Sequence, residues 1–210
     1  MKTYLITILT ISALLAMSTA GSAQLVTPSP DLPPDGDYVS PDEYHTYLAM
    51  GIVLDDPSHD RFLNVVRTPL GPDELESFDS DFSAVEVGMG LGPMMLTGPV
   101  QVITSGKVGN TTGTFDTEII AMSLTSNTPL GVITVRQDPN RATLGQTTIT
   151  DIGGGLYQID SFFDVFTELS VDGGASWIPS DTSTHMRLTP EPATLALMLM
   201  GAVALLRGRR

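Results

Sequence analysis

Polar and aromatic residues that could stabilise a turn or contact a sugar lie together in the segment Ser170-Val171-Asp172-Gly173-Gly174-Ala175-Ser176-Trp177. The carboxylate of Asp172 can accept hydrogen bonds from backbone amides of a turn, and Gly174 can adopt a positive φ angle without strain. Trp177 is the one tryptophan of the chain, and its indole can either cover the turn or stack against a sugar ring. The segment therefore predicts a stabilised hairpin turn, with a glycan contact through Trp177 as the alternative.

The same segment resembles the Asp-box, S-x-D-x-G-x-[ST]-W, of sialidases and other propeller proteins. In those proteins the box is a structural hairpin that lies away from the catalytic centre, so the resemblance implies a turn that stabilises the fold. Propellers repeat the box in successive blades, whereas this chain has one copy. We therefore do not expect a propeller.

Pairs of carboxylates could perform glycoside hydrolysis, which uses two Asp or Glu side chains on either side of the scissile bond. Asp116 with Glu118 and Asp164 with Glu168 are such pairs in sequence, but the chain has 24 acidic residues and pairs of this kind arise by chance. No G-x-S-x-G nucleophile motif is present. We predict no catalytic residues and no enzymatic activity, with a glycan-processing hydrolase as the less favoured alternative.

The Gly-rich segment Gly88-Met89-Gly90-Leu91-Gly92 resembles a phosphate-binding loop in composition only. Phosphate loops lead into a helix whose N-terminus faces the anion, and Pro93 follows this segment directly. We interpret residues 88–92 as a flexible loop between two strands.

Metal ligands are available but are not arranged in a known pattern. Asp55-Asp56-Pro57-Ser58-His59-Asp60 and Asp79-Ser80-Asp81 could offer oxygen atoms to calcium, but neither segment has the EF-hand spacing. The chain contains no cysteine, which excludes disulfides, thiolate zinc sites and a cysteine nucleophile. We predict no metal site and no cofactor, and calcium is the one ion that the acidic segments suggest. The three histidines are scattered without ligand spacing: His45, His59 and His185.

The charge of the chain argues against two classes of partner. Residues 24–189 contain six of the ten Lys and Arg and 23 of the 24 Asp and Glu. This part therefore has a formal charge of −17, compared with −14 for the whole chain. A surface so acidic repels phosphate groups, so we expect neither nucleic acid nor anionic lipid to bind it.

The two ends of the chain are apolar and predict export. Lys2 precedes an apolar run that continues to Met17, and small residues follow up to Ala23. This order is typical of a secretory signal peptide, predicted here as residues 1–23 with cleavage after Ala23 and with Ala20 as the alternative position. Residues 193–206 form a second uncharged run, about 21 Å long as a helix and therefore short for a hydrocarbon core of about 30 Å.

The C-terminal segment 189–210 resembles the PEP-CTERM protein-sorting signal. Pro190, Glu191 and Pro192 precede the apolar run, and Arg207, Arg209 and Arg210 follow it. The resemblance implies that exosortase, a membrane enzyme, recognises the tripeptide and processes the tail. It also implies transient anchoring in the inner membrane, and a final place at the cell surface or in an extracellular matrix that contains exopolysaccharide.

The rest of the chain predicts an all-β fold. Five prolines between residues 24 and 41 indicate an extended, unpacked linker. Ser40-Pro41-Asp42-Glu43 resembles a capping box and predicts a short helix as far as Leu48 or Ala49. Short apolar or alternating runs separated by Gly, Pro, Asn and Asp then predict an antiparallel β-sandwich of about eight or nine strands over residues 42–188. The runs are residues 62–66, 84–87, 100–103, 119–124, 131–135, 147–152, 156–159, 162–171 and 186–188.

These features together predict an exported, non-enzymatic surface or matrix protein. A carbohydrate-binding module that uses Trp177 is the first alternative. The body of the chain does not indicate a specific ligand.

Overall fold

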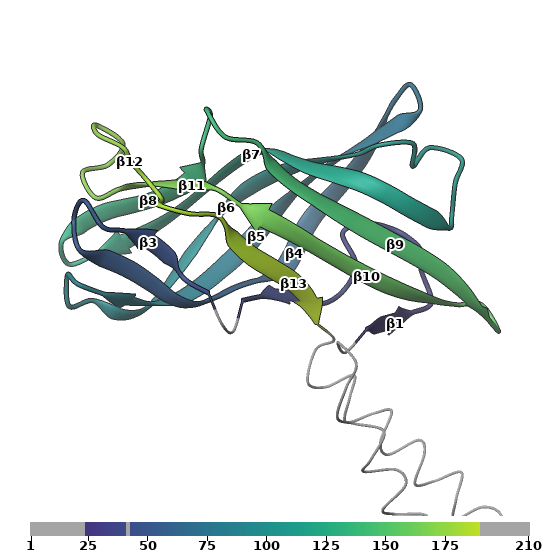
Figure 1. Cartoon of the computed structure of the whole chain (residues 1–210), viewed down its shortest axis with the longest axis horizontal. Helices are drawn as coiled ribbons and strands as arrows, with labels where there is room; N and C mark the ends of the chain where they lie inside the picture. Colours follow the sequence, from purple (N-terminus) through teal and green to yellow (C-terminus); the bar gives the residue numbers. More distant parts are fainter. Residues whose placement is uncertain (1–23, 41–42, 190–210) are drawn as a thin grey trace, which may run out of the picture.

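The computed structural model describes residues 24–40 and 43–189, and this part of the chain is entirely antiparallel β-structure (Figure 1). The prediction of an all-β fold is confirmed. The strands are β1 (Leu25–Thr27), β2 (Asp37–Val39), β3 (His45–Tyr47), β4 (Ile52–Leu70), β5 (Asp73–Val87), β6 (Gly92–Thr104), β7 (Gly113–Thr128), β8 (Gly131–Gln137), β9 (Thr143–Gly153), β10 (Leu156–Val165), β11 (Thr167–Ser170), β12 (Ile178–Pro179) and β13 (Thr184–Thr189).

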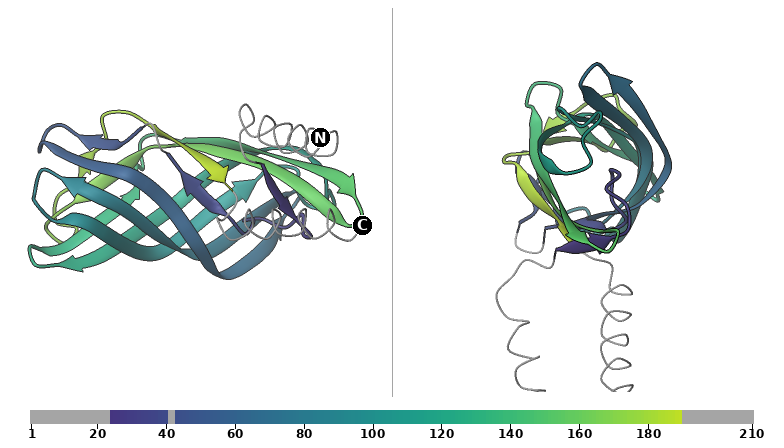
Figure 2. Two further views of the ribbon diagram at one scale, coloured as in Figure 1. Left: turned by 90° about the horizontal axis from the view of Figure 1, so that it is seen from below. Right: turned by 90° about the vertical axis from the view of Figure 1, so that its right-hand side faces the viewer.

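All of these strands belong to one sheet, and eight of them close into a barrel in the order β10-β13-β2-β4-β5-β6-β7-β9 and back to β10. The right-hand view of Figure 2 looks into this ring. The expected arrangement of two stacked sheets is therefore not what forms. A strand pattern with one buried face is common to sandwiches and barrels, and closure depends on which strands pair at the two edges.

Strand β7 pairs with two different strands along the same edge, so the sheet branches at one end of the barrel. The first half of β7 pairs with β9 and its second half with β8. The β8 strand then pairs with β11, and β11 pairs with β12. On the other side β3 pairs with β4, and the Asp181 amide donates to the Thr46 carbonyl at 2.9 Å. This contact joins the segment after β12 to β3.

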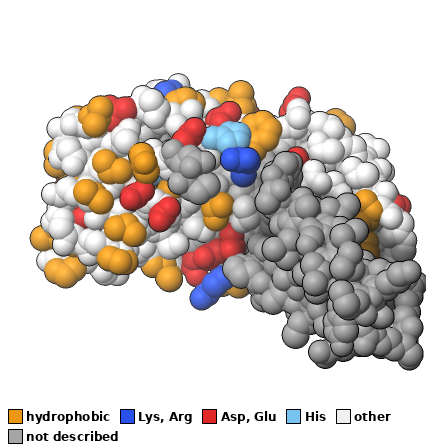
Figure 3. Space-filling model, turned by 60° about the horizontal axis from the view of Figure 1, so that its bottom comes forward, with side chains coloured by type: hydrophobic (Ala, Val, Ile, Leu, Met, Phe, Trp, Pro, Cys, Tyr) orange, Lys and Arg blue, Asp and Glu red, His pale blue; other side chains and the backbone are white. Residues whose placement is uncertain are grey.

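The core lies inside the barrel. Side chains alternate between inward and outward positions along each strand, as the pleat requires. In β5 the inward row includes Glu76, Phe78, Ser80 and Phe82, all of which are buried. The outward row and the loops carry most of the charge. In Figure 3 the hydrophobic side chains on the surface are scattered among acidic and other polar groups.

Strand β4 bends around the barrel at irregular positions. Its pairing with β5 shifts register three times, and Asp56, Arg61 and Asn64 have φ values of 50°, 49° and 55°. Extra residues in one strand of a pair increase its local twist and bend. The acidic segment 55–60 therefore belongs to a bent strand.

The segment 24–40 is packed, so the predicted unpacked linker is wrong. Leu25 of β1 and Leu32 are buried in the core, and the Tyr38 ring of β2 stacks against Phe163 with a centroid distance of 5.6 Å. Strand β2 is also one of the eight strands that form the barrel. Prolines are compatible with edge positions and irregular segments, so their number did not prevent packing.

The predicted helix that ends at Leu48 or Ala49 is also wrong. Residues 45–47 form β3, and His45 pairs with Leu54 of β4. The Tyr47 side chain is fully buried, and its hydroxyl group lies 2.7 Å from Thr167 Oγ1. The burial of a large aromatic ring outweighs the local preference of a capping-box pattern, which is worth about 1 kcal/mol. Pro41 and Asp42 of that pattern lie outside the described residues.

Candidate functional site

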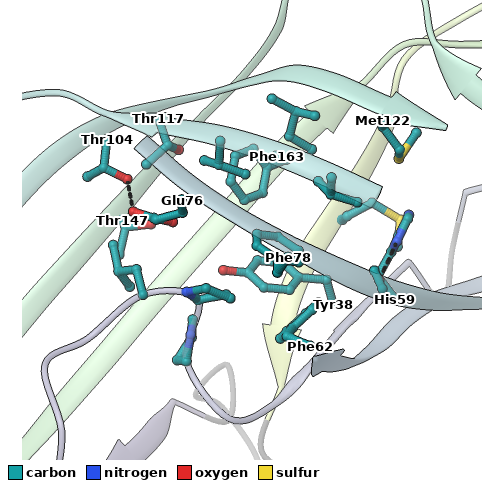
Figure 4. A pocket seen from close by; sticks show the side chains of 18 of the residues that line it. Tyr38, His59, Phe62, Glu76, Phe78, Thr104, Thr117, Met122, Thr147 and Phe163 are labelled. Carbon is teal, nitrogen blue, oxygen red and sulfur yellow. Dashed lines mark hydrogen bonds between the residues drawn. The ribbon is translucent and has the colours of Figure 1, made fainter. Parts of the chain in front are cut away.

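The interior of the barrel contains a cavity of about 50 Å³ (Figure 4). Its walls come from β2, β4, β5, β6, β7, β9, β10 and β13 and from the segment between β1 and β2. Most of the wall is apolar, with Phe78, Val102, Ile119, Met122 and Phe163 among the residues that line it. Small-ligand sites usually combine an apolar wall with a few polar groups, and this cavity has both.

Glu76 is the acidic residue of this cavity. Its side chain points inward from β5, and the residue is 2% exposed. The Thr104 hydroxyl on β6 donates to Glu76 Oε1 at 2.7 Å. Burial raises the pKa of Glu76 to about 7, because removal from water disfavours the carboxylate, and the nearby charge of Glu74 raises it further.

Hydroxyl groups continue from Glu76 around the inside of the barrel. Thr104 is the cross-strand partner of Thr117 on β7. On the other side Thr147 Oγ1 lies 2.7 Å from Ser161 Oγ, which accepts a hydrogen bond of 2.9 Å from the Tyr38 hydroxyl. We call this set of inward polar side chains the polar belt. It consists of Tyr38, Glu76, Thr104, Thr117, Thr147 and Ser161.

Thr117 is the member of the polar belt without a partner in the described part of the chain. The residue is 4% exposed and its Oγ1 makes no hydrogen bond there. The Thr117 hydroxyl has room at this position because residue 145 on β9 is a glycine. A Cβ atom at Gly145 would lie 2.9 Å from Thr117 Oγ1. A buried hydroxyl without a partner costs about 1–3 kcal/mol, so this atom is a natural point for a ligand or water to bind.

The far part of the cavity is closed by His59 and its aromatic neighbours. His59 Nδ1 lies 3.4 Å from Ser80 Oγ, and the imidazole packs against Phe82 with a centroid distance of 4.8 Å. Burial lowers the pKa of His59 to about 4, since the charged imidazolium is disfavoured away from water. The ring is therefore neutral at pH 7.

The segment between β1 and β2 covers the cavity near Glu76. Leu32, Pro33 and Pro34 line the cavity, and Leu32 is buried. The Arg67 Nε atom of β4 donates to the Leu32 carbonyl at 2.6 Å. We call residues 32–34 the strap.

The segment 170–177 forms the predicted stabilised turn, between β11 and β12. Asp172 Oδ1 accepts hydrogen bonds from the Ser170 hydroxyl at 2.8 Å and from the Ser176 amide at 2.9 Å. Asp172 Oδ2 accepts a bond of 2.5 Å from the Ser176 hydroxyl, and the Gly174 amide donates to Ser170 Oγ at 2.8 Å. The hydrogen bonds from Ser176 and Ser170 lower the pKa of Asp172 to about 2.

Trp177 is half-buried and one face of its ring is covered. The Arg136 guanidinium of β8 stacks on the indole, with its Cζ atom 3.7 Å from the ring centroid. Arg136 also forms an ion pair of 2.6 Å with Glu168 of β11. A sugar could stack on that face only after Arg136 moved, so the geometry favours the structural interpretation of Trp177 over the glycan contact.

The carboxylates that could form hydrolytic pairs make separate interactions. Asp164 lies 2.8 Å from His185 Nδ1, and Glu168 binds Arg136 as described. Asp116 accepts a hydrogen bond of 3.1 Å from the side-chain amide of Gln146. These contacts do not place two carboxylates opposite each other across a cleft.

Residues 88–91 of the Gly-rich segment form the inter-strand loop between β5 and β6, and Gly92 is the first residue of β6. Two backbone amides of this segment already donate to a side chain of the protein. Glu86 accepts hydrogen bonds from the Met89 amide at 2.6 Å and from the Leu91 amide at 2.9 Å. The carboxylate of Glu86 thus takes the place that a bound anion would occupy.

Two acidic residues of β5 are paired with nitrogen groups of β4. Asp81 forms an ion pair of 2.9 Å with Arg61, and Asp79 accepts a hydrogen bond of 2.7 Å from the Asn64 amide. Within residues 24–40 and 43–189, no cluster of three or more His, Cys, Asp or Glu side chains is arranged to hold a metal ion. The same residues include no helix long and apolar enough to cross a bilayer.

The sequence analysis did not identify Glu76, Thr117 or the other residues of the polar belt. One signal was present, since Glu76, Phe78 and Phe82 share the even-numbered face of β5. A carboxylate in register with two core aromatics indicates a buried acid. The predicted sorting residues lie outside the described residues: Ala23, Pro190, Glu191, Pro192, Arg207, Arg209 and Arg210.

Comparison with known proteins gave no matching protein-family model, no matching curated protein and no matching solved structure.

Proposed function

We propose that this chain is an exported, non-enzymatic barrel protein that is delivered to the cell surface or the extracellular matrix through its C-terminal signal. The observation that carries this proposal is the position of the folded part. Strand β1 begins at Leu25, just after the predicted cleavage site at Ala23, and β13 ends at Thr189, just before Pro190. Removal of residues 1–23 and 190–210 would leave every strand of the barrel intact.

The two ends of the folded part lie close together, which supports the same proposal. A Cβ atom at Gly36 would meet the Thr189 carbonyl oxygen at 2.8 Å and the Leu25 Cδ2 atom at 3.5 Å. A protein whose first and last strands meet at one point can be held from that point while the rest of its surface faces outward. Exosortase is the proposed processing partner, and exopolysaccharide is the proposed surrounding of the mature protein.

The proposal is tested by replacing Pro190, Glu191 and Pro192 with alanine in cells that contain the matching exosortase. We expect the variant to keep its tail and remain in the membrane fraction, whereas the wild-type protein is shortened and reaches the surface or the medium. Mass spectrometry of the C-terminal peptide and fractionation measure both effects.

Two controls make this experiment specific. Replacing Thr182 and Ser183 with alanine changes polar residues just before β13 and leaves the tripeptide unaltered, so processing should be normal. Deletion of the exosortase should reproduce the behaviour of the tripeptide variant. If the tripeptide variant has the same mass and location as the wild-type protein, the sorting proposal is wrong.

A further inference from the structure

We propose that the barrel interior binds a small, uncharged aliphatic alcohol, with its hydroxyl group at Thr117 and its carbon chain against the apolar wall. This inference concerns the body of the protein and does not depend on the sorting of the tail. It starts from the unpartnered hydroxyl of Thr117, which is buried in the wall of the cavity.

The polar belt has a gap at Thr117. Thr104 is engaged by Glu76 on one side, and Thr147 is engaged by Ser161 on the other. A hydroxyl group both donates and accepts hydrogen bonds. An alcohol placed in this gap can therefore satisfy Thr117 Oγ1 whichever way the neighbouring hydroxyl groups are oriented.

The charge of the cavity selects against ionised ligands. A carboxylate ligand would meet Glu76, whose own charge is already disfavoured by burial. An ammonium group would lose its hydration in an interior whose wall is largely apolar, including Phe78, Ile119 and Met122. It would be paired only if Glu76 ionised, and burial disfavours that ionisation. Burial of an unpaired charge costs far more than burial of a hydrogen-bonded hydroxyl, so a neutral alcohol is favoured over an acid or an amine.

The volume of the cavity limits the size of the ligand. One water molecule, which has a single non-hydrogen atom, requires about 10–15 Å³ in this measure. A cavity of about 50 Å³ therefore suits an alcohol of roughly two to four carbon atoms. Leu32 of the strap forms part of the wall, so its side chain sets the upper limit of the size.

The binding test uses the full-length chain in lipid nanodiscs with ¹³C-labelled methionine methyl groups. Met122 and Met186 line the cavity, whereas Met95 is exposed on the outside of β6. Titration with 1-propanol should shift the Met122 and Met186 signals in a saturable way, and the Met95 signal should not follow them. For a ligand of this size we expect a dissociation constant on the order of millimolar.

Variants distinguish the proposed site from general solvent effects. Thr117→Val removes the hydroxyl at nearly constant shape and should weaken 1-propanol binding about five- to tenfold, the value of one hydrogen bond. Thr125→Val is the matched control, because Thr125 is exposed on the same strand. In this control the affinity should equal that of the wild-type protein.

A second variant tests the limit on the size of the ligand. Its result does not depend on whether Thr117→Val folds. Leu32→Ala shortens the strap side chain and should allow 1-pentanol to bind at least fivefold more tightly than it binds the wild-type chain. The proposal is overturned if Met122 and Met186 do not respond, if Met95 responds equally, or if Thr117→Val binds 1-propanol as the wild-type chain does. Unchanged 1-pentanol affinity in Leu32→Ala would overturn the assigned place of the ligand.

Discussion

Three buried titratable residues respond to pH in opposite directions. Burial lowers the pKa of His45 to about 3 and that of His59 to about 4, both from 6.5. Their contribution to stability is present above pH 6.5 and is lost as the pH falls, toward about 4 for His59 and about 3 for His45, because the unfolded chain binds the protons more tightly. Glu76 has a pKa raised from 4.5 to about 7. Its contribution is present below pH 4.5 and is lost as the pH rises through 7.

At the residue scale we therefore predict that Glu76→Gln becomes more stable than the wild-type chain as the pH rises. Glutamine keeps the shape and the hydrogen-bonding oxygen of the protonated acid but cannot ionise. The free energy of unfolding of the variant should exceed that of the wild-type chain by about 1–3 kcal/mol at pH 8.5 and should be similar to it at pH 5. Thermal unfolding followed by circular dichroism between these pH values measures the difference.

The control for this prediction is Glu118→Gln on β7, whose side chain lies on the outward row. This control should not change the pH dependence. A difference between wild type and Glu76→Gln that is constant from pH 5 to 8.5 would show that Glu76 does not ionise in this range.

At the scale of single elements, the β11–β12 hairpin shows how a short segment holds its own shape. Asp172 bonds Ser170 and Ser176 on both sides of the turn, and Gly173 and Gly174 have φ values of 71° and 93°. Residues with Cβ atoms rarely adopt such angles. The hairpin is thus encoded locally, and Arg136 of the neighbouring strand β8 contacts it at Trp177 and at Glu168.

We predict that Asp172→Ala loosens this hairpin and leaves the barrel folded. The variant loses the acceptor of the Ser176 amide, so amide hydrogen exchange over residues 171–178 should become faster. Exchange in β5 and β6 should remain slow, because those strands are paired along their whole length. Hydrogen–deuterium exchange with mass spectrometry resolves these peptides.

Asp160→Ala is the matched control for the hairpin, because Asp160 is exposed on β10 and lies outside the turn. Its exchange pattern should equal that of the wild-type chain. Unchanged protection of residues 171–178 in Asp172→Ala would contradict the assigned role of the carboxylate.

At the scale of the whole molecule, closure of the barrel depends on close contact between β9 and its neighbours. Gly145 lies between Thr117 of β7 and Phe163 of β10. A Cβ atom at Gly145 would lie 2.1 Å from the Phe162 carbonyl oxygen and 2.6 Å from Phe163 Cδ1. Neither contact is possible without movement of the backbone, so this position requires the absence of a side chain.

We predict that Gly145→Ala destabilises the barrel by about 1–3 kcal/mol, the usual cost of an extra carbon in a packed interior. Urea unfolding measures the change. Gln146→Ala is the control, since Gln146 is exposed at the next position, and its effect should stay within about 0.5 kcal/mol. Equal stability of Gly145→Ala and the wild-type chain would mean that β9 can move away from β10 at little cost.

Much of the fold could be predicted from the sequence because strands have a period of two. Eight of the nine predicted apolar runs lie entirely in strands. The run 162–171 is divided between β10 and β11 by Phe166, and its last residue, Val171, follows the end of β11. The strands β1, β2 and β3 were not predicted, since each has three residues. Segments so short carry no measurable alternation, and Leu25 or Tyr47 becomes a core residue only through its long-range contacts.

The candidate site also has one part that the sequence predicts and one part that it does not. The turn at Asp172 follows from residues close in sequence, and the sequence by itself determined that turn, the all-β class and the acidic charge. The cavity depends on groups far apart, since Tyr38 bonds Ser161 and Glu76 bonds Thr104. Only the tertiary structure decided that one sheet closes into a barrel, that burial raises the pKa of Glu76, and that Thr117 lacks a partner. The period of two can indicate that Glu76 faces the core, but cross-strand pairing results from chain closure and no local pattern of residues specifies it.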